Sequence, residues 1–166
     1  MRRFLVAGNW KMNGSSALTA ELINGISSSV SQASGSSELA YDILVCPPAV
    51  YLSQAVSIAD DTPVNVGAQN VSQFNSGAYT GELSLAMLAE AGCDYVLLGH
   101  SERRELFSET DQQIAEKFAA CVESEYSIVP VLCVGETLAD RQSGNTEAVV
   151  AKQLDAVINA VGITGF

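Results

Sequence analysis

Histidine, basic residues and long apolar runs are scarce in this sequence of 166 residues. Histidine occurs once, as His100, and the four cysteines lie far apart without a C-x-x-C pair, so the usual ligands of a zinc site are almost missing. The apolar run near the N-terminus, FLVAG, is too short for a signal-peptide core, and no run is long enough to cross a bilayer. We therefore expect no metal, no membrane attachment, and reduced cysteines in a cytoplasmic protein.

Positive charge is scarce as well. The chain has 8 basic and 19 acidic residues, which gives a formal net charge of −11 at pH 7. Such a charge repels nucleic acid and anionic membrane surfaces, so neither is expected as a partner. A small anionic substrate would also be repelled unless a local cation reversed the field. A lysine in a candidate site therefore carries particular weight in this chain.

Short apolar runs alternate with segments of helical period along the chain. Several of the runs are apolar on both faces, which is typical of parallel strands covered by helices. Five runs predict strands, at residues 3–8, 41–46, 64–68, 95–99 and 127–135. Apolar residues at helical spacing predict helices around Leu22, Val56, Phe118 and Leu154. The pattern predicts five consecutive βα units in one α/β domain spanning 1–166.

Two local signals place helix ends. Thr110 and Gln113 have the spacing of a capping box at the start of a helix, and Gly162 is a stop signal for the last one. The pattern alone favours an open, flavodoxin-like sheet, because a closed barrel of eight βα units normally needs about 250 residues.

Polar residues that follow the strands are the candidates for function, because functional groups in parallel α/β folds gather beyond the carboxyl ends of the strands. Taken singly, each has an ordinary explanation: a lone lysine is usually solvated, and a lone histidine is usually a hydrogen-bonded structural residue. Arg103 and Arg104 have the pattern of surface charge. The candidates are Asn9 and Lys11 after the first strand, Gln69, Asn70, Thr80 and Glu82 after the third, His100 after the fourth, and Cys133 and Glu136 after the fifth.

Taken together, four strings resemble triosephosphate isomerases: GNWKMNG, GAYTGE, GHSERRELF and CVGETL, in this order and at these distances. The likeness runs along the whole chain and includes the CPP turn after the second strand. It implies a (β/α)₈ TIM barrel, of which this chain would hold about five βα units. It also implies interconversion of dihydroxyacetone phosphate and D-glyceraldehyde 3-phosphate through an enediol(ate), in glycolysis and gluconeogenesis, by a homodimer without metal or organic cofactor.

The resemblance also implies roles for individual residues. Asn9 and Lys11 look like the substrate-contacting pair, and the charge of Lys11 would stabilise a developing enediolate. His100 is similar to the electrophile that polarises the substrate carbonyl and shuttles protons between its two oxygens. Glu102 resembles a carboxylate that orients Lys11 or His100, and Ser101 resembles a residue that caps the following turn.

Other residues resemble parts of a subunit interface. Thr80 and Glu82 look like the tip of a loop that enters the neighbouring subunit, with Glu82 meeting Arg103 across the interface.

Cys133 is similar to a family cysteine near the catalytic base, with a packing role.

No residue of this sequence matches the catalytic base of the family. In the family it is a glutamate in a Y-E-P-V-W-type segment, and this sequence stops at AVGITGF, before such a segment. The phosphate-binding loops after strands seven and eight are missing too. Glu102 and Glu136 are not expected to act as the base, so the isolated chain is expected to be inactive.

Two readings compete with the enzyme. One is a non-catalytic open α/β module that self-associates through its strand edges. The other is a flavodoxin-like phosphate or flavin binder, which would need a hydroxyl-rich loop where GNWKMNG stands.

Overall fold

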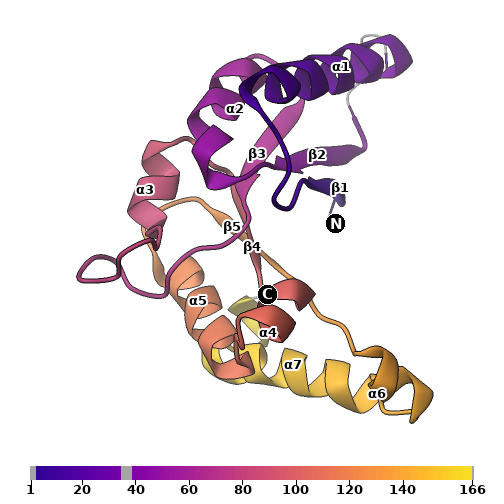
Figure 1. Ribbon diagram of the computed structural model, residues 1–166, viewed down its shortest axis with the longest axis vertical. Helices are drawn as coiled ribbons and strands as arrows, with labels where there is room; N and C mark the ends of the chain where they lie inside the picture. Colours follow the sequence, from indigo (N-terminus) through magenta and orange to yellow (C-terminus); the bar gives the residue numbers. More distant parts are fainter. Residues whose placement is uncertain (1–2, 35–38, 166) are drawn as a thin grey trace. The chain divides into compact units, whose positions relative to one another are not determined.

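The computed structural model describes residues 3–34 and 39–165 (Figure 1). The chain forms two compact units, Met1–Asn70 with Ala86–Val96, and Val71–Leu85 with Leu97–Phe166. The five strands follow the order β1-β2-β3-β4-β5, and β4 (Tyr95–Leu98) is divided between the units. The predicted α/β class, with strands and helices alternating, is confirmed. A single domain over 1–166 stays a prediction.

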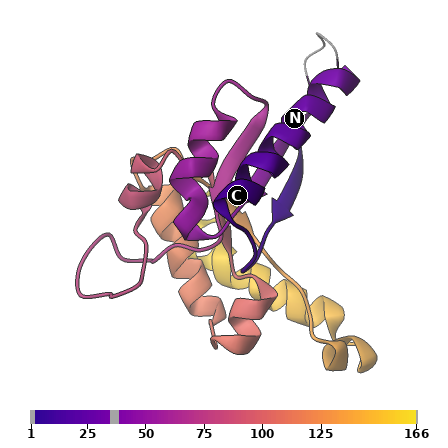
Figure 2. The same ribbon diagram turned by 45° about the horizontal axis from the view of Figure 1, so that its top comes forward.

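The first unit is a parallel sheet covered by helices. α1 and α2 pack side by side, and α2 packs on β3 (Figure 2). β1 pairs parallel with β2, β2 with β3, and β3 with the first half of β4. The other elements of this unit are β1 (Phe4–Asn9), α1 (Ser16–Ser34), β2 (Tyr41–Cys46), the 3-10 turn η1 (Ala49–Tyr51), α2 (Leu52–Ala59), β3 (Val64–Ala68) and all but the first residue of α3 (Leu85–Glu90).

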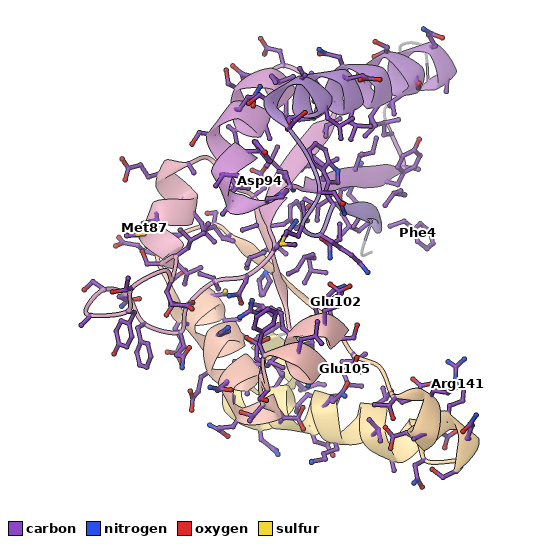
Figure 3. The ribbon with its side chains drawn as sticks, in the orientation of Figure 1. Phe4, Met87, Asp94, Glu102, Glu105 and Arg141 are labelled. Carbon is purple, nitrogen blue, oxygen red and sulfur yellow. The ribbon has the colours of Figure 1, made fainter. Side chains whose placement is uncertain are left out.

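Burial differs sharply between the strands of this unit. β2 and β3 are largely buried, in agreement with their apolar character on both faces. In β1 the side chains of Phe4 and Val6 are 82% and 58% exposed, and Phe4 projects away from the strand (Figure 3). The expectation of covered strands is therefore wrong for β1. Its place at the end of the strand order leaves it with β2 as its strand neighbour in the described chain.

The second unit holds residues 71–85 and runs from the second half of β4 through β5. The backbone N–H of Cys133, the residue after β5, donates to Leu98 O of β4 at 2.8 Å. α5 packs on α7 and on β5, with Ile114, Phe118 and Val157 buried. The elements of this unit after β4 are α4 (Ser101–Leu106), α5 (Asp111–Glu123), β5 (Val129–Leu132), α6 (Leu138–Gln142), α7 (Thr146–Val161) and the 3-10 turn η2 (Ile163–Gly165).

The helix signals in the sequence hold in the structure. Thr110 caps α5 through a capping box with Gln113, and α7 ends at Gly162, whose φ is +73°. The short helices α3, α4 and α6 were not among the predicted elements, because five or six residues are too few to show a helical period. The fifth strand is also shorter than predicted, Val129–Leu132 instead of 127–135.

Gly99, at the end of β4, tests the packing of the second unit. Its φ is +73°, and an added Cβ would lie 2.9 Å from Arg104 Nη2 and 2.9 Å from Ile114 Cδ1. We expect Gly99→Ala to lower the free energy of unfolding by more than about 1 kcal/mol, because both the backbone and the neighbours oppose a side chain. Urea unfolding of the whole protein measures this.

The matched control is Gly25→Ala, since Gly25 lies inside α1 and an added Cβ meets nothing within 4 Å. There alanine should stabilise by roughly 0.5–1 kcal/mol. Equal effects of the two substitutions would contradict the packing around Gly99.

Candidate active site

The loop after β1 holds Lys11 in an uncommon backbone conformation. Lys11 has φ of +52°, a region that residues other than glycine enter seldom. The side-chain Oδ1 of Asn9 accepts a hydrogen bond from Lys11 N–H at 2.9 Å, which is the local pairing that lets an asparagine stabilise such a turn. The structure therefore brings Asn9 and Lys11 together, with the lysine side chain exposed. Backbone strain of this kind gathers at functional sites.

Gln69, one residue beyond β3, fastens this loop to the sheet. Its Nε2 donates to Lys11 O and to Cys46 O, both at 2.8 Å. Cys46 is the last residue of β2 and fully buried, and its carbonyl also accepts from Trp10 N–H at 3.0 Å. One amide group thus ties the end of β2 to the residue that carries the candidate cation.

His100 is the N-cap of α4, directly after β4. Its Nδ1 accepts a hydrogen bond from the backbone N–H of Glu102 at 3.2 Å. An accepting Nδ1 places the proton of a neutral imidazole on Nε2, which makes Nε2 the hydrogen-bond donor of the ring. The side chain is 22% exposed. A half-buried imidazole with a donating Nε2 can polarise a carbonyl oxygen.

The carboxylate of Glu102 lies beside the same ring. Its Oε2 is 3.6 Å from His100 Nδ1, and its side chain is 44% exposed. The carboxylate therefore lies on the Nδ1 side of the ring. The predicted role of Glu102, to orient Lys11 or His100, stays a prediction. Ser101 begins α4, but its cap is the His100 side chain, so the expectation that Ser101 caps this turn is wrong.

Arg104 sits one turn further along α4 and is only 16% exposed. Its Nε donates to Gly99 O at 2.7 Å, Nη1 donates to Asp111 Oδ1 at 2.6 Å, and Nη2 donates to Cys133 O at 3.3 Å. These acceptors belong to the end of β4, the start of α5 and the end of β5. The pattern of surface charge suggested by the sequence is therefore wrong for Arg104.

Arg103 belongs to a buried group of charges. Its Nε lies 3.4 Å from Glu109 Oε2, and Glu109 also pairs with Lys117 of α5. Glu109 and Lys117 are both less than a tenth exposed. Arg103 also stacks over the ring of Phe107, 5.3 Å from its centroid. Arg103 thus has partners within its own chain.

Of the three residues predicted to form a subunit interface, Glu82 and Arg103 line one pocket of the second unit. The loop between β3 and α3 is closed at its base by a bond from Ser72 N–H to Leu83 O at 2.8 Å. Thr80 is exposed near its tip. Glu82 and Arg103 both line a pocket of about 260 Å³, together with Phe74, Tyr79, Phe107 and Glu109.

The remaining candidates have environments that limit their chemistry. The backbone N–H of Glu136 and the guanidinium of Arg141 hold the pKa of the Glu136 carboxyl below its usual value, so it stays ionised and paired. Burial raises the pKa of the Cys133 thiol, while the charge of Arg104 opposes this. A thiol with a raised pKa is a poor nucleophile, which agrees with a packing role.

Metal-ligand clusters and membrane-spanning helices are both absent from the described part of the chain. Residues 3–34 and 39–165 contain no group of three or more histidine, cysteine, aspartate or glutamate side chains suited to a metal ion. None of the helices described there is both long and apolar enough to cross a bilayer.

Comparison with known proteins gives the family. The family model of triosephosphate isomerase matches residues 4–166. The chain belongs to the triosephosphate isomerase family. It is 51% identical over 163 residues to the triosephosphate isomerase of Dechloromonas aromatica, and 49% identical over 162 residues to that of Alcanivorax borkumensis. These matches cover 98% of this chain. Membership of this family confirms the partial TIM barrel predicted from the motifs.

The chain spans about 62% of the length of the relatives it matches. A more distant one, from Photorhabdus laumondii, is 44% identical over 166 residues with 62% of its length covered.

The structure brings together some predicted residues and adds others. Asn9 lies with Lys11, and His100 with Glu102; that the two pairs act on one substrate stays a prediction. Sequence reasoning noted Gln69 without a role and misread Arg104. The position of Gln69 directly after a strand was a signal for its role. No local pattern showed that three acceptors from different elements converge on Arg104.

Gln69→Leu tests how the Lys11 loop is held. The substitution keeps side-chain volume but removes both donated bonds, so the free energy of unfolding should fall by about 1–3 kcal/mol. Chemical denaturation of the whole protein measures this. Gln54→Leu is the control, because Gln54 makes one exposed bond, to Ser16 O, and should cost under about 0.5 kcal/mol. If the two variants were equally stable, Gln69 would not hold the loop.

Proposed function

We propose that the protein carrying this chain is a triose-phosphate isomerase, which interconverts dihydroxyacetone phosphate and D-glyceraldehyde 3-phosphate through an enediol(ate). The observation that supports this most is His100 at the carboxyl end of β4, with Nδ1 occupied by the Glu102 N–H and Nε2 left as the donor. The reaction needs a donor of this kind at the substrate oxygen. Membership of the family favours this reading over a non-catalytic α/β module.

Lys11 would supply the positive charge that the reaction needs. The substrate is a phosphate ester and its intermediate carries a further negative charge, whereas the chain has a net charge of −11. A cation held close to the reacting oxygen offsets that field and stabilises charge that develops in the transition state. The backbone of Lys11 is held by Asn9 and Gln69, so its position is set before substrate arrives.

His100 would move the proton between the two substrate oxygens. The neutral ring donates from Nε2 to the carbonyl oxygen as the enediolate forms, and takes a proton back from the neighbouring hydroxyl. Nδ1 keeps the hydrogen bond from the Glu102 N–H throughout, so the proton leaves and returns at Nε2. The proton on carbon must be removed by a base, and Glu136 is poorly suited because it is ionised and paired with Arg141. Inactivity of residues 1–166 by themselves stays a prediction.

Location and partners form part of the proposal. The four cysteines are free in the structure, which supports a reducing, cytoplasmic environment. The proposed partners are a small phosphorylated triose and a second copy of the chain.

Substitutions in the whole protein test the proposed roles. Lys11→Ala should reduce kcat/KM by at least about a hundredfold, because it removes a charge that acts on the transition state. His100→Gln should lower kcat far more than it raises KM, because proton transfer is affected more than binding. A coupled assay in both directions measures this.

Arg141→Ala serves as the control, since it removes a cation that is 73% exposed and stands out from α6 (Figure 3). It should leave the rate within about twofold. Near-parental rates for both Lys11→Ala and His100→Gln would show that these roles are wrong.

We also propose that two copies associate through the loop that carries Thr80 and Glu82. Phe74 and Tyr79 stack with centroids 4.2 Å apart, and each is more than two fifths exposed. Phe107, from the end of α4, lines the same pocket and is 68% exposed. Exposed aromatic groups of this kind are typical of association surfaces. In the proposed dimer, Glu82 of one copy meets Arg103 of the other.

Charge reversal distinguishes pairing between copies from pairing within one copy. Glu82→Arg and Arg103→Glu should each weaken the dimer, because each places like charges opposite one another. Mixing the two variants should restore association, because every contact between unlike copies then joins opposite charges. Analytical ultracentrifugation of each variant and of the mixture measures this.

Glu105→Arg is the control, since Glu105 lies on the same helix outside the pocket lining. A mixture that stays as weakly associated as its components would argue against the cross-copy pair.

A further inference from the structure

We propose that Arg104 is a positioning residue for His100, which it orients through the peptide group between Gly99 and His100. This rests on the proposed function for its catalytic meaning, but its structural part can be tested separately. Arg104 Nε donates a hydrogen bond to the carbonyl of that peptide, Gly99 O, at 2.7 Å. That carbonyl and the N–H of His100 belong to one planar unit, so holding one holds the other.

The backbone of α4 completes a closed arrangement. His100 O accepts from Arg103 N–H at 2.8 Å and from Arg104 N–H at 3.2 Å. Arg104 therefore bonds on both sides of His100. Its side chain donates to Gly99 O, and its backbone N–H donates to His100 O. Rotation about the φ and ψ of His100 would break contacts on both sides.

The guanidinium is itself anchored at two other points. Nη1 donates to the Asp111 carboxylate at the first position of α5, and Nη2 donates to the carbonyl of Cys133, just after β5. Because a guanidinium is planar, three acceptors fix its plane. The end of β4 is thus held against α5 and β5, and Gly99 stays in its left-handed conformation with φ of +73°.

The consequence lies at the imidazole. The bond from Glu102 N–H to His100 Nδ1 is 3.2 Å long, so a small rotation of the ring or of the first turn of α4 would lose it. With that bond lost, the neutral ring is free to carry its proton on either nitrogen. Only the form with the proton on Nε2 presents a donor from Nε2.

The test compares Arg104→Lys and Arg104→Met with the parent whole protein. Correlation of imidazole protons with ring nitrogens by NMR, at a pH where the ring is neutral, reports which nitrogen carries the proton. The His100 signals are identified by their absence from His100→Gln. In the parent we expect distinct signals for a bare Nδ1 and a protonated Nε2.

In Arg104→Met the two nitrogen shifts should move toward one another, and Arg104→Lys should fall between, because a lysine cannot donate to three separated oxygens at once. The kcat of Arg104→Lys should fall about 10- to 100-fold, as expected for a displacement on the order of 1 Å, with KM changed less than about threefold. Arg141→Met is the matched control, and both its nitrogen shifts and its kcat should equal those of the parent.

A purely structural role for Arg104 predicts a different result: a lower unfolding midpoint with unchanged imidazole shifts in the protein that remains folded. Parental shifts in folded Arg104→Met would overturn the proposal. If that variant does not fold, Arg104→Lys and Asp111→Ala, which removes one of the three acceptors, take its place, and parental shifts in both would overturn it equally. Altered shifts in a protein without isomerase activity would uphold the positioning role and reject the proposed function.

Discussion

The geometry of the second unit depends on one guanidinium that satisfies three oxygen atoms from three elements. Two of the acceptors are carbonyls at the ends of β4 and β5, and the third is the carboxylate of Asp111. A cation that is 16% exposed needs such partners, because an unpaired charge out of water is costly. Arg104 needs these acceptors to balance its charge. Because all three bond to one guanidinium, they also fix where β4, β5 and α5 meet. Lysine carries the same charge without the planar fork.

The two units hold their candidate residues by the same principle with different side chains. In the first unit the amide of Gln69 bonds to two carbonyls, and Asn9 supports the left-handed backbone of Lys11. In the second unit Arg104 takes the place of the amide, and the left-handed residue is Gly99, next to His100. In both, a polar side chain from outside the loop bonds to the backbone at or beside a residue with positive φ. Such conformations aim a side chain where a regular strand or helix would not.

The sequence pattern predicted elements well where they are long and buried on both faces, and poorly where contacts between distant residues decide. The strands at 41–46 and 64–68 match β2 and β3 at both ends, because burial on both faces demands an unbroken apolar run. β1 has the same apolar character, yet its exposure follows from its place in the strand order, which no local pattern contains. The misreading of Arg104 has a similar cause. Asp111 and Cys133 lie 7 and 29 residues away along the chain, so their convergence is a product of the fold.

Contacts that orient His100 lie within a short part of the chain. The acceptors and donors that surround its backbone and ring run from Gly99 to Cys133, all inside the second unit. Each of these bonds joins residues of the second unit, so this part of the orientation is set within that unit. Local bonds of this kind suit a proton-transfer group, because ring orientation sets which nitrogen donates and must persist while substrate enters and leaves. The His100 ring is then aligned by its own neighbours, separately from the residues that supply charge or remove the proton from carbon.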